Sequence, residues 1–219
     1  PEVVVNCTGL RKSEQFDPMR SIRILSLLPH RLAHMCEQRG ARLIQVSSDG
    51  VFSGARGAYT EDDLPDATEW YGIAKLLGEV SGLHTVTLRT SIIGHELGTK
   101  QGLLEWFLSQ EGECRCYTRA VFSGLPTVVF AGIIRDVVMP SPSLHGVYHV
   151  AAEPISKFDL LTLIAREYEK SIIMVPDDTV VIDRSLVAAR FRDATQYAPP
   201  AWPELVRTMH SYQHPPTRA

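Results

Sequence analysis

The order of apolar runs along the first half of the chain is the feature that most restricts its fold. Residues 2–6 (EVVVN), 41–48 (ARLIQVSS) and 84–93 (HTVTLRTSII) are short runs rich in β-branched residues, which is typical of strands buried on both faces. Two segments with apolar residues at helical spacing, 21–40 and 68–82, separate these strands. Strands that alternate with helices in this way form βαβ units, so the pattern predicts a parallel sheet.

The second half of the chain is less regular and predicts a smaller, mostly helical lobe. A fourth strand is expected at 146–152 (GVYHVAA), returning to the main sheet. Helices are expected at 103–110, 128–138, 157–170, 184–195 and 202–212. We therefore expect an α/β protein in which residues 1–110 form a Rossmann-like parallel sheet flanked by helices. Residues 111–219 would form a small, mostly helical C-terminal substrate-binding lobe.

The overall composition is that of a globular protein and argues against several functions. Hydrophobic residues make up 44% and charged residues 21% of the chain, as in ordinary folded domains. A net charge of -3 gives no reason to expect nucleic acid or an anionic membrane as a partner. No apolar run approaches the roughly 20 residues of a membrane span, and no signal-peptide pattern opens the chain. We expect a cytoplasmic protein that binds neither nucleic acid nor membranes.

The cysteines and histidines do not form a recognisable metal site. Of Cys7, Cys36, Cys114 and Cys116, only the last two are close together, as C-x-C, and no second pair completes a zinc pattern. The eight histidines are scattered along the chain. The sequence therefore predicts free thiols in a reducing compartment and no bound metal.

Three short polar segments end predicted strands and mark a candidate ligand site. In an open parallel sheet, ligands bind outside the carboxyl ends of the strands. These segments are NCTG (6–9), SSDG (47–50) and RTSI (89–92). Small residues let the backbone approach a flat cofactor closely, and hydroxyls can bind a ribose, an amide or a carbonyl. Small and hydroxylated residues often follow a strand at the start of a loop, so one such segment alone does not indicate a ligand site. The interpretation depends on the other residues nearby.

The helix predicted at 68–82 carries Tyr71 and Lys75 four residues apart, and this spacing places them on one face. A free tyrosine has a pKa of about 10, which is too high for efficient proton exchange near neutrality. A nearby ammonium favours the phenolate, so the pair can pass a proton to a carbonyl oxygen as hydride reaches its carbon. A hydroxyl from Ser48 would hold that oxygen. Tyr-x-x-x-Lys alone arises by chance in many helices, but the serines that precede it favour a catalytic role.

The same residues resemble a known enzyme family. ARLIQVSSDGVFSG (41–54), GAYTEDDLPDATEWYGIAKLLGE (57–79) and VTLRTSIIG (86–94) resemble the extended short-chain dehydrogenase/reductases. Within that group the chain is most similar to the dTDP-4-dehydrorhamnose reductase-like family. Two later segments of the chain, GLPT (124–127) and 146–165, resemble the corresponding segments of that family. The resemblance implies a Rossmann-like fold, NADP or NAD as cofactor and a nucleotide-sugar substrate, and it leaves a homodimer open.

The resemblance also assigns roles by position. Its catalytic residues fall on Ser48, Tyr71 and Lys75, with Tyr71 as the acid and Lys75 also binding the nicotinamide ribose. The implied cofactor-binding residues are Cys7, Thr8, Gly9, Ser47, Tyr71, Lys75 and Thr90. The implied substrate-binding residues are Ser48, Asp49, Ser91 and Ile92.

The chain departs from the family pattern in two ways. The family's opening βαβαβ segment, with its glycine-rich pyrophosphate-binding turn, has no counterpart before Pro1. At about 30 residues per βαβ unit, roughly 60 residues would be missing, so we expect this chain alone to be inactive and strand 2–6 to be a hydrophobic sheet edge. Relatives also place a proton-relaying asparagine in the first matched helix, where this chain has Leu25.

Two function hypotheses follow from these features. The first is an NAD(P)H-dependent reductase of a 4-keto nucleotide sugar, which the Ser48, Tyr71 and Lys75 set favours. The alternative is a non-catalytic regulatory or scaffold member of the same fold family, which Leu25 favours. The regulatory β subunit of methionine adenosyltransferase, which resembles this family, is a precedent for the alternative.

Two other polar groups have simpler expected roles. Glu61, Asp62 and Asp63 predict a solvated acidic loop. His95 and Glu96 follow the third strand and would either belong to a surface loop or reach the substrate.

Overall fold

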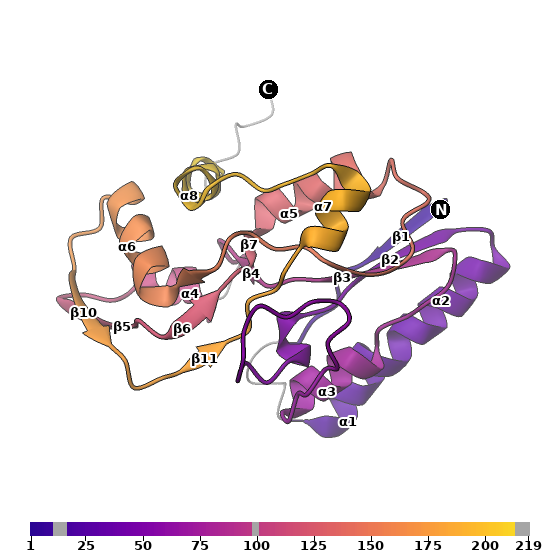
Figure 1. Cartoon of the computed structure of the whole chain (residues 1–219), viewed down its shortest axis with the longest axis horizontal. Coiled ribbons are helices and arrows are strands. Elements are labelled where there is room, and N and C mark those ends of the chain that lie inside the picture. The colour runs from indigo at the N-terminus through magenta and orange to yellow at the C-terminus, as the bar shows by residue number, and fades with distance from the viewer. Residues whose placement is uncertain (11–16, 98–100, 213–219) are drawn as a thin grey trace.

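A computed structural model describes residues 1–10, 17–97 and 101–212 of the chain. Its centre is a four-stranded parallel sheet in the order β1-β2-β3-β8 (Figure 1). These strands are β1 (Val3–Asn6), β2 (Arg42–Val46), β3 (Thr85–Arg89) and β8 (Gly146–His149). The predicted α/β class, with a Rossmann-like parallel sheet flanked by helices, is thereby confirmed.

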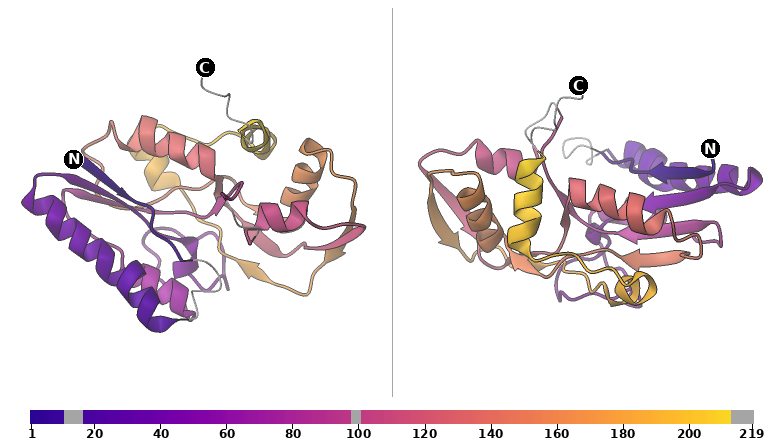
Figure 2. Two further views of the ribbon diagram at one scale, coloured as in Figure 1. Left: turned by 180° about the vertical axis from the view of Figure 1, so that it is seen from behind. Right: turned by 90° about the horizontal axis from the view of Figure 1, so that it is seen from above.

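Helices lie on both sides of this sheet, as the two opposite views of Figures 1 and 2 show. The helices on one side are α2 (Leu28–Gln38) and α3 (Trp70–Leu77), and those on the other are α5 (Thr127–Ile133) and α7 (Ala189–Thr195). A parallel sheet needs cover on both faces, which explains why its strands read as continuous apolar runs.

The helix predicted at 21–40 is continuous and contains a π-helical segment. It comprises α1 (Pro18–Ser21), the π-helical η2 (Ile22–Leu27) and α2. Pro29, at the start of α2, has no N–H to bond the carbonyl of Leu25, so the regular α-helical ladder cannot run through this point. A π-helical segment inside an α-helix accommodates this break in the hydrogen-bond pattern.

Several short strands lie after the main sheet strands β1 to β3, and except for β4, which falls within the run predicted at 84–93, the sequence did not reveal them. They form three small sheets, β10-β5, β11-β6-β9 and β4-β7. The strands are β4 (Ile92–Ile93), β5 (Glu113–Tyr117), β6 (Ala120–Phe122), β7 (Leu125–Pro126), β9 (Ile155–Ser156), β10 (Ile173–Asp177) and β11 (Ile182–Asp183). The helical elements are α4 (Leu103–Leu108), η4 (Ile134–Val138), α6 (Lys157–Glu167) and α8 (Trp202–Ser211). Runs this short are hard to recognise by periodicity, which needs several repeats.

The helix predicted at 184–195 is wrong in its first part. Residues 184–188 precede α7 and lie beside the loop that follows β2. Tyr59 N donates to Ser185 O at 2.9 Å, and Val187 N donates to Tyr59 O at 2.7 Å. These bonds satisfy the backbone groups of the segment in an extended form, so they override its helical spacing.

One hydrophobic core joins the sheet to the lobe. Ile44 and Leu88 of the sheet belong to the same buried cluster as Phe107 of α4 and Leu205 of α8. The cavities between the two parts are therefore lined by elements fixed to a common core. The four cysteines are free, as predicted.

Other surface features bear on the sequence predictions. Strand β1 pairs only with β2 in the part of the chain that the structure describes, and Val5 on it is 40% exposed, so β1 is a hydrophobic edge.

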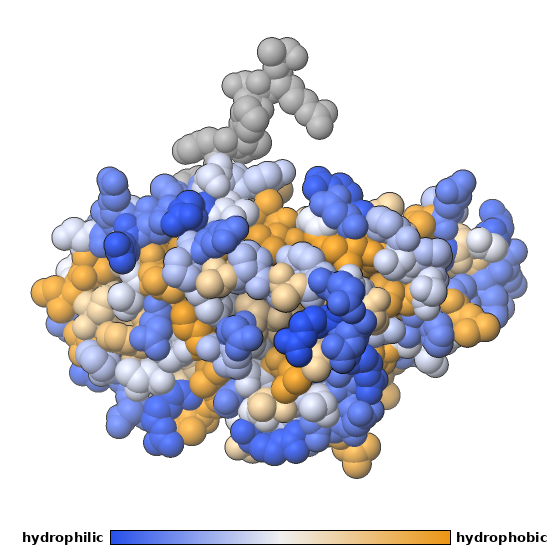
Figure 3. Space-filling view, turned by 45° about the horizontal axis from the view of Figure 1, so that its top comes forward, coloured by the Kyte–Doolittle hydropathy of each residue, from blue (hydrophilic) through white to orange (hydrophobic). Residues whose placement is uncertain are grey.

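The face in Figure 3 mixes hydrophobic and hydrophilic residues. Within the described ranges, no helix is long and apolar enough to cross a membrane, and no group of three or more His, Cys, Asp or Glu residues is arranged to hold a metal ion.

Candidate active site

Lys75 connects the carboxyl ends of two neighbouring strands. Its Nζ donates to Thr8 O, just after β1, at 3.3 Å and to Val46 O, the last residue of β2, at 3.1 Å. The residue is only 6% exposed. An ammonium has three N–H donors, so this arrangement leaves one for a further partner. Tyr71 lies one turn earlier in α3, as the spacing predicted.

The turn that presents the Thr8 carbonyl is held by Asn6. The side chain of Asn6 is buried, and its Nδ2 donates to Gln45 Oε1 at 2.7 Å. Its Oδ1 accepts from Thr8 N at 3.1 Å and from Thr8 Oγ1 at 2.5 Å. Sequence reasoning missed this role, although an asparagine that ends a buried strand is a signal for such a turn.

Ser48 and Tyr71 meet at Gly50. A Cβ placed on Gly50 would lie 3.2 Å from Ser48 Oγ and 3.3 Å from Tyr71 Cε1. Ser48 Oγ also accepts from Gly50 N at 3.0 Å, which fixes the serine at the start of the 3-10 turn η3 (Asp49–Val51). The predicted hydroxyl and the predicted acid therefore both lie against one glycine, and a side chain there would crowd them.

The environment of Tyr71 keeps its phenol protonated. Burial raises the pKa of Tyr71, a hydrogen bond with Ser48 opposes the rise, and the nearby Asp49 adds to it. The hydroxyl of Ser48 donates to Asp49 Oδ1 at 3.1 Å. We expected the ammonium of Lys75 to favour the phenolate. In this structure that ammonium bonds to two carbonyls instead, and the net shift is upward. A protonated phenol is the form that an acid needs before it gives up its proton.

Lys75 titrates close to the physiological range. Burial lowers the pKa of its amine to about 8, while the charges of Cys7 and Glu79 oppose that change. The amine is therefore mostly charged at neutral pH and loses its charge in mildly alkaline solution.

A cavity of about 280 Å³ brings the predicted substrate-binding residues together. Asp49, Ser91 and Ile92 line it. Burial raises the pKa of Asp49, and Ser48, Arg184 and Ser91 partly offset the effect. Two of the three predicted strand-end segments, 47–50 and 89–92, thus contribute to one cavity, and the segment 6–9 does not line it.

Arg184 and Lys157 line the same cavity, and sequence reasoning missed both. Arg184 Nε is buried and has no hydrogen-bond partner among the described residues. Its Nη2 lies 3.8 Å from Glu69 Oε2. A guanidinium and an ammonium at one cavity suit an anionic ligand such as a phosphate. Arg184 could not be found from sequence, because it precedes α7 in the stretch that we expected to be helical.

The remaining predicted cofactor residues fall into two groups. Cys7 lies close enough to Lys75 for their charges to interact, and a Cβ on Gly9 would meet no atom of the described residues within 4 Å. Ser47 and Thr90 use their hydroxyls within the protein. Ser47 Oγ donates to Glu79 Oε1 at 2.7 Å, and Thr90 Oγ1 donates to Ser91 O at 3.2 Å. These bonds use the single donor of each hydroxyl and leave its oxygen able to accept from a cofactor.

His95 and Glu61 have structural partners instead of a place in the site. His95 lies in the lobe, with Nδ1 2.8 Å from Glu105 Oε1 and Nε2 2.9 Å from Tyr168 Oη. The prediction that Glu61 is solvated is wrong. Its side chain is 4% exposed, and its Oε1 accepts from His149 N at 2.8 Å.

Leu25 brings no polar side chain to the site. It is 1% exposed and lies in η2 beneath α3. Its carbonyl approaches Gly78 so closely that a Cβ there would lie 1.8 Å away. The proton relay that the resemblance led us to look for therefore has no side-chain counterpart at this position.

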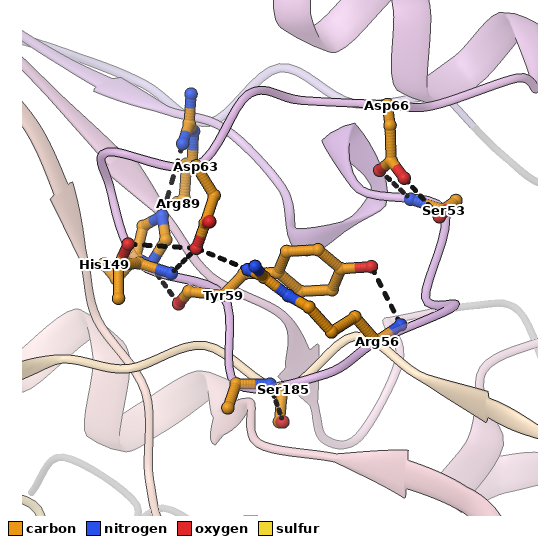
Figure 4. A network of polar contacts seen from close by, with 10 residues as sticks. Ser53, Arg56, Tyr59, Asp63, Asp66, Arg89, His149 and Ser185 are labelled. Atoms are coloured by element: carbon orange, nitrogen blue, oxygen red, sulfur yellow. Dashed lines mark hydrogen bonds and ion pairs between the residues drawn. The ribbon is translucent and has the colours of Figure 1, made fainter.

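A buried polar network lies at the carboxyl end of β8 (Figure 4). His149 Nδ1 lies 3.1 Å from Tyr59 O, so Nδ1 carries the proton and Nε2 accepts from Arg89 Nη1 at 3.3 Å. Burial, together with the charge of Arg89, lowers the pKa of His149 to about 3. The imidazole is therefore neutral in the folded protein.

This neutral histidine predicts a loss of stability in acid. An unfolded histidine has a pKa of about 6.5, so the unfolded chain takes up this proton first as the pH falls. The free energy of unfolding should drop by up to about 1.4 kcal/mol per pH unit from about pH 6.5 towards about pH 3. Urea unfolding at about pH 7 and about pH 5 should show a smaller drop for His149→Gln than for the parent. Equal drops in the two proteins would contradict this assignment.

The fold and the site together define a class. The parallel sheet flanked by helices is Rossmann-like, with Ser48 after β2 and with Tyr71 and Lys75 on α3. The chain belongs to the RmlD substrate binding domain family, whose model matches residues 1–190.

Curated relatives of two kinds are similar to the chain. Methionine adenosyltransferase 2 subunit beta of Xenopus tropicalis is 25% identical over 188 residues, covering 75% of this chain and 54% of that protein. A dTDP-4-dehydrorhamnose reductase of Streptomyces griseus is 37% identical over 83 residues, covering 36% of this chain and 27% of that protein. The chain spans about half the length of the methionine adenosyltransferase subunits that it matches.

Solved structures share the fold. The dTDP-4-dehydrorhamnose reductase of Bacillus anthracis str. Ames, in complex with NADP, matches with a TM-score of 0.84 and 19% identity over 97% of this chain and 81% of that one. RMD from Pseudomonas aeruginosa, complexed with NADPH, matches with a TM-score of 0.76 and 19% identity over 96% of this chain and 80% of that one. At such identities the likeness establishes the architecture alone.

Proposed function

We propose that the protein reduces the 4-keto group of a nucleotide sugar with NADPH or NADH. The observation that supports this proposal is the contact of Ser48 and Tyr71 at Gly50, with Lys75 one turn further along α3 and Asp49, the residue after Ser48, lining a cavity that also holds Lys157 and Arg184. The dehydrogenase/reductase fold and the family membership support it.

The residues at the end of β1 fit a nicotinamide cofactor. A Cβ on Gly9 would meet none of the described residues within 4 Å, and the buried Lys75 keeps one N–H donor for a ribose hydroxyl. When bound, NADPH or NADH would supply the hydride. Cys7 and Thr8 would line the cofactor with small side chains and backbone.

The chain's own residues would handle the proton and the developing charge. Ser48 Oγ would donate a hydrogen bond to the carbonyl oxygen of the sugar, where negative charge develops. The phenol of Tyr71, held protonated by burial, would transfer its proton to that oxygen. The ammonium of Lys75 would then stabilise the phenolate. Asp49, Ser91 and Ile92 would contact the sugar.

Arg184 is expected to bind the diphosphate of the substrate. A hydrogen bond to a charged group contributes about 1.5–3 kcal/mol, so Arg184→Gln should raise KM for the nucleotide sugar by about 10- to 100-fold. The effect on kcat and on the Kd of NADPH should be much smaller. Steady-state kinetics and calorimetry on the full-length protein would measure these constants. An Arg190→Gln protein is the matched control, because Arg190 pairs with Asp62 outside the cavity. Similar KM values for the two variants would contradict the role of Arg184.

The proposed activity can be tested directly on the full-length protein. Purified protein would be mixed with NADPH or NADH and a panel of 4-keto nucleotide sugars that includes dTDP-4-dehydrorhamnose. The proposal predicts oxidation of the cofactor with at least one member of the panel. A failure with every keto sugar, in protein shown to bind the cofactor, would count against it.

The alternative is a regulatory role, and two observations favour it. Several of the curated relatives are methionine adenosyltransferase 2 subunits beta, and Leu25 replaces the expected relay residue. A regulatory protein would co-purify with a partner enzyme and change that enzyme's activity. It would not oxidise NADPH with any keto sugar.

A further inference from the structure

Glu79 continues the face of α3 that carries Tyr71 and Lys75. It stands four residues after Lys75, just beyond Gly78, the C-cap of the helix. Its carboxylate is nearly buried, and the mechanism above gives it no task. Ionised carboxylates in such places persist only when they are paired and hydrogen-bonded.

The carboxylate of Glu79 is held by two residues. Ser47 Oγ donates to its Oε1 at 2.7 Å. Arg89 Nε donates to Oε1 and Arg89 Nη2 to Oε2, both at 2.8 Å. This bidentate pairing fixes the direction of the carboxylate as well as its charge.

Arg89 is itself immobilised. It is 5% exposed, its Nη1 lies 3.3 Å from His149 Nε2, and its guanidinium carbon lies 5.3 Å from the ring centroid of Phe52 (Figure 4 shows Arg89 against His149). The position of Glu79 is thus set by the carboxyl ends of β2, β3 and β8 together.

Glu79 acts on Lys75 through the backbone and through charge. Lys75 Nζ donates to Val46 O, and the next residue, Ser47, is the one whose hydroxyl binds Glu79. Glu79 therefore tethers the peptide that receives the ammonium. Its negative charge also opposes the effect of burial on the pKa of Lys75.

We propose that Glu79 is a positioning residue for Lys75: held by Ser47 and Arg89, it fixes the end of β2 that receives the ammonium and keeps that ammonium charged. The inference rests on the proposed function, because the charge of Lys75 has a catalytic purpose only there. The titratable and charged groups around the pair are Cys7 after β1, Tyr71 on α3, Arg89 on β3 and His149 on β8.

The test measures the titration of Lys75 without relying on turnover. Trace acetylation of the folded protein across a pH series, read by mass spectrometry, reports the pKa of each lysine. Removal of a nearby buried charge in Glu79→Gln should lower the pKa of Lys75 from about 8 by about one unit. In the full-length protein, the pH profile of kcat should shift in the same direction, with little change in KM. Glu79→Asp retains the charge and should restore most of both properties.

Lys170 is the internal control in the same experiment. It also donates to two backbone carbonyls, Leu108 O at 2.9 Å and Gln110 O at 2.7 Å, but it lies in the lobe. Its titration should not change in Glu79→Gln. A Lys75 titration identical in parent and variant would overturn the inference, and so would an equal shift in Lys170.

A second variant guards against misfolding. Glu79→Gln leaves the guanidinium of Arg89 buried without a counter-charge, which can be strongly destabilising. The double variant Glu79→Gln/Arg89→Met removes both charges. Loss of the cation offsets part of the loss of the carboxylate, so a smaller fall in the pKa of Lys75 is expected than in Glu79→Gln. The two proposals fail separately. An unshifted Lys75 in an active enzyme removes only the role of Glu79, whereas a shifted Lys75 in a protein that reduces no keto sugar removes only the reductase.

Discussion

A Tyr71→Phe variant of the full-length protein is expected to lose keto-sugar reduction by about 10²–10⁴-fold, the usual contribution of a positioned general acid. Phenylalanine retains the ring that lies against Gly50, so the fold and the affinity for the cofactor should persist. Ser48 could still hold the carbonyl oxygen but would have no proton donor behind it. Turnover and NADPH titration on the same sample would separate the two properties.

The matched control for this variant is Tyr117→Phe. Tyr117 lies on β5 in the lobe, outside the cavity that holds the candidate site, so the loss of its hydroxyl should leave turnover unchanged. Near-parental turnover in Tyr71→Phe would show that another group supplies the proton, and the proposed mechanism would then be wrong.

Gly72→Ala is expected to lower the free energy of unfolding by about 2–3 kcal/mol, as overpacking of a tight contact does. Its new Cβ would lie 2.1 Å from Gly50 O and 2.7 Å from the Cβ of Ala67. Alanine is a better helix former than glycine by about 1 kcal/mol, so a helix free of this contact would be stabilised. The clash should also push Tyr71 away from Ser48 and reduce turnover. Urea unfolding and kinetics would measure both effects.

Gly132→Ala provides the opposite expectation in another helix. Gly132 lies in α5, and a Cβ there would meet no atom of the described residues within 4 Å. The substitution should raise stability by about 0.5–1 kcal/mol. If the two substitutions changed stability in the same direction, the close approach of α3 to Gly50 would not be the cause.

The main sheet could be predicted from sequence because its strands are buried on both faces. Runs such as EVVVN and HTVTLR carry a strong local signal, and the helices between them fix the parallel order. The lobe gave no such signal. Strands such as β7 and β11 span two residues each, and the form of residues 184–188 is set by bonds to the distant Tyr59. Local spacing carries no information about such partners.

The residues of the candidate site differ in the same way: some could be predicted from local sequence, and others could not. Tyr71 and Lys75 stand at a helical spacing, and Ser48 ends a strand, so local pattern and the topology of the sheet were enough to select them. Arg184 enters the cavity from the far end of the sequence, and the contact of Glu79 with Arg89 depends on the register of β3. The downward shift expected for the pKa of Tyr71 also depended on the direction of the Lys75 side chain, which only the structure supplies.

The most direct test of the reductase proposal is the transfer of a labelled hydride. The full-length protein would be incubated with NADPH that carries deuterium at the reactive position of its nicotinamide, together with a 4-keto nucleotide sugar, and the product would be examined by mass spectrometry. The account predicts a sugar that carries the deuterium at C4, formed by the parent and by Tyr117→Phe but not by Tyr71→Phe. A product without deuterium, or no product from protein that binds both ligands, would contradict it.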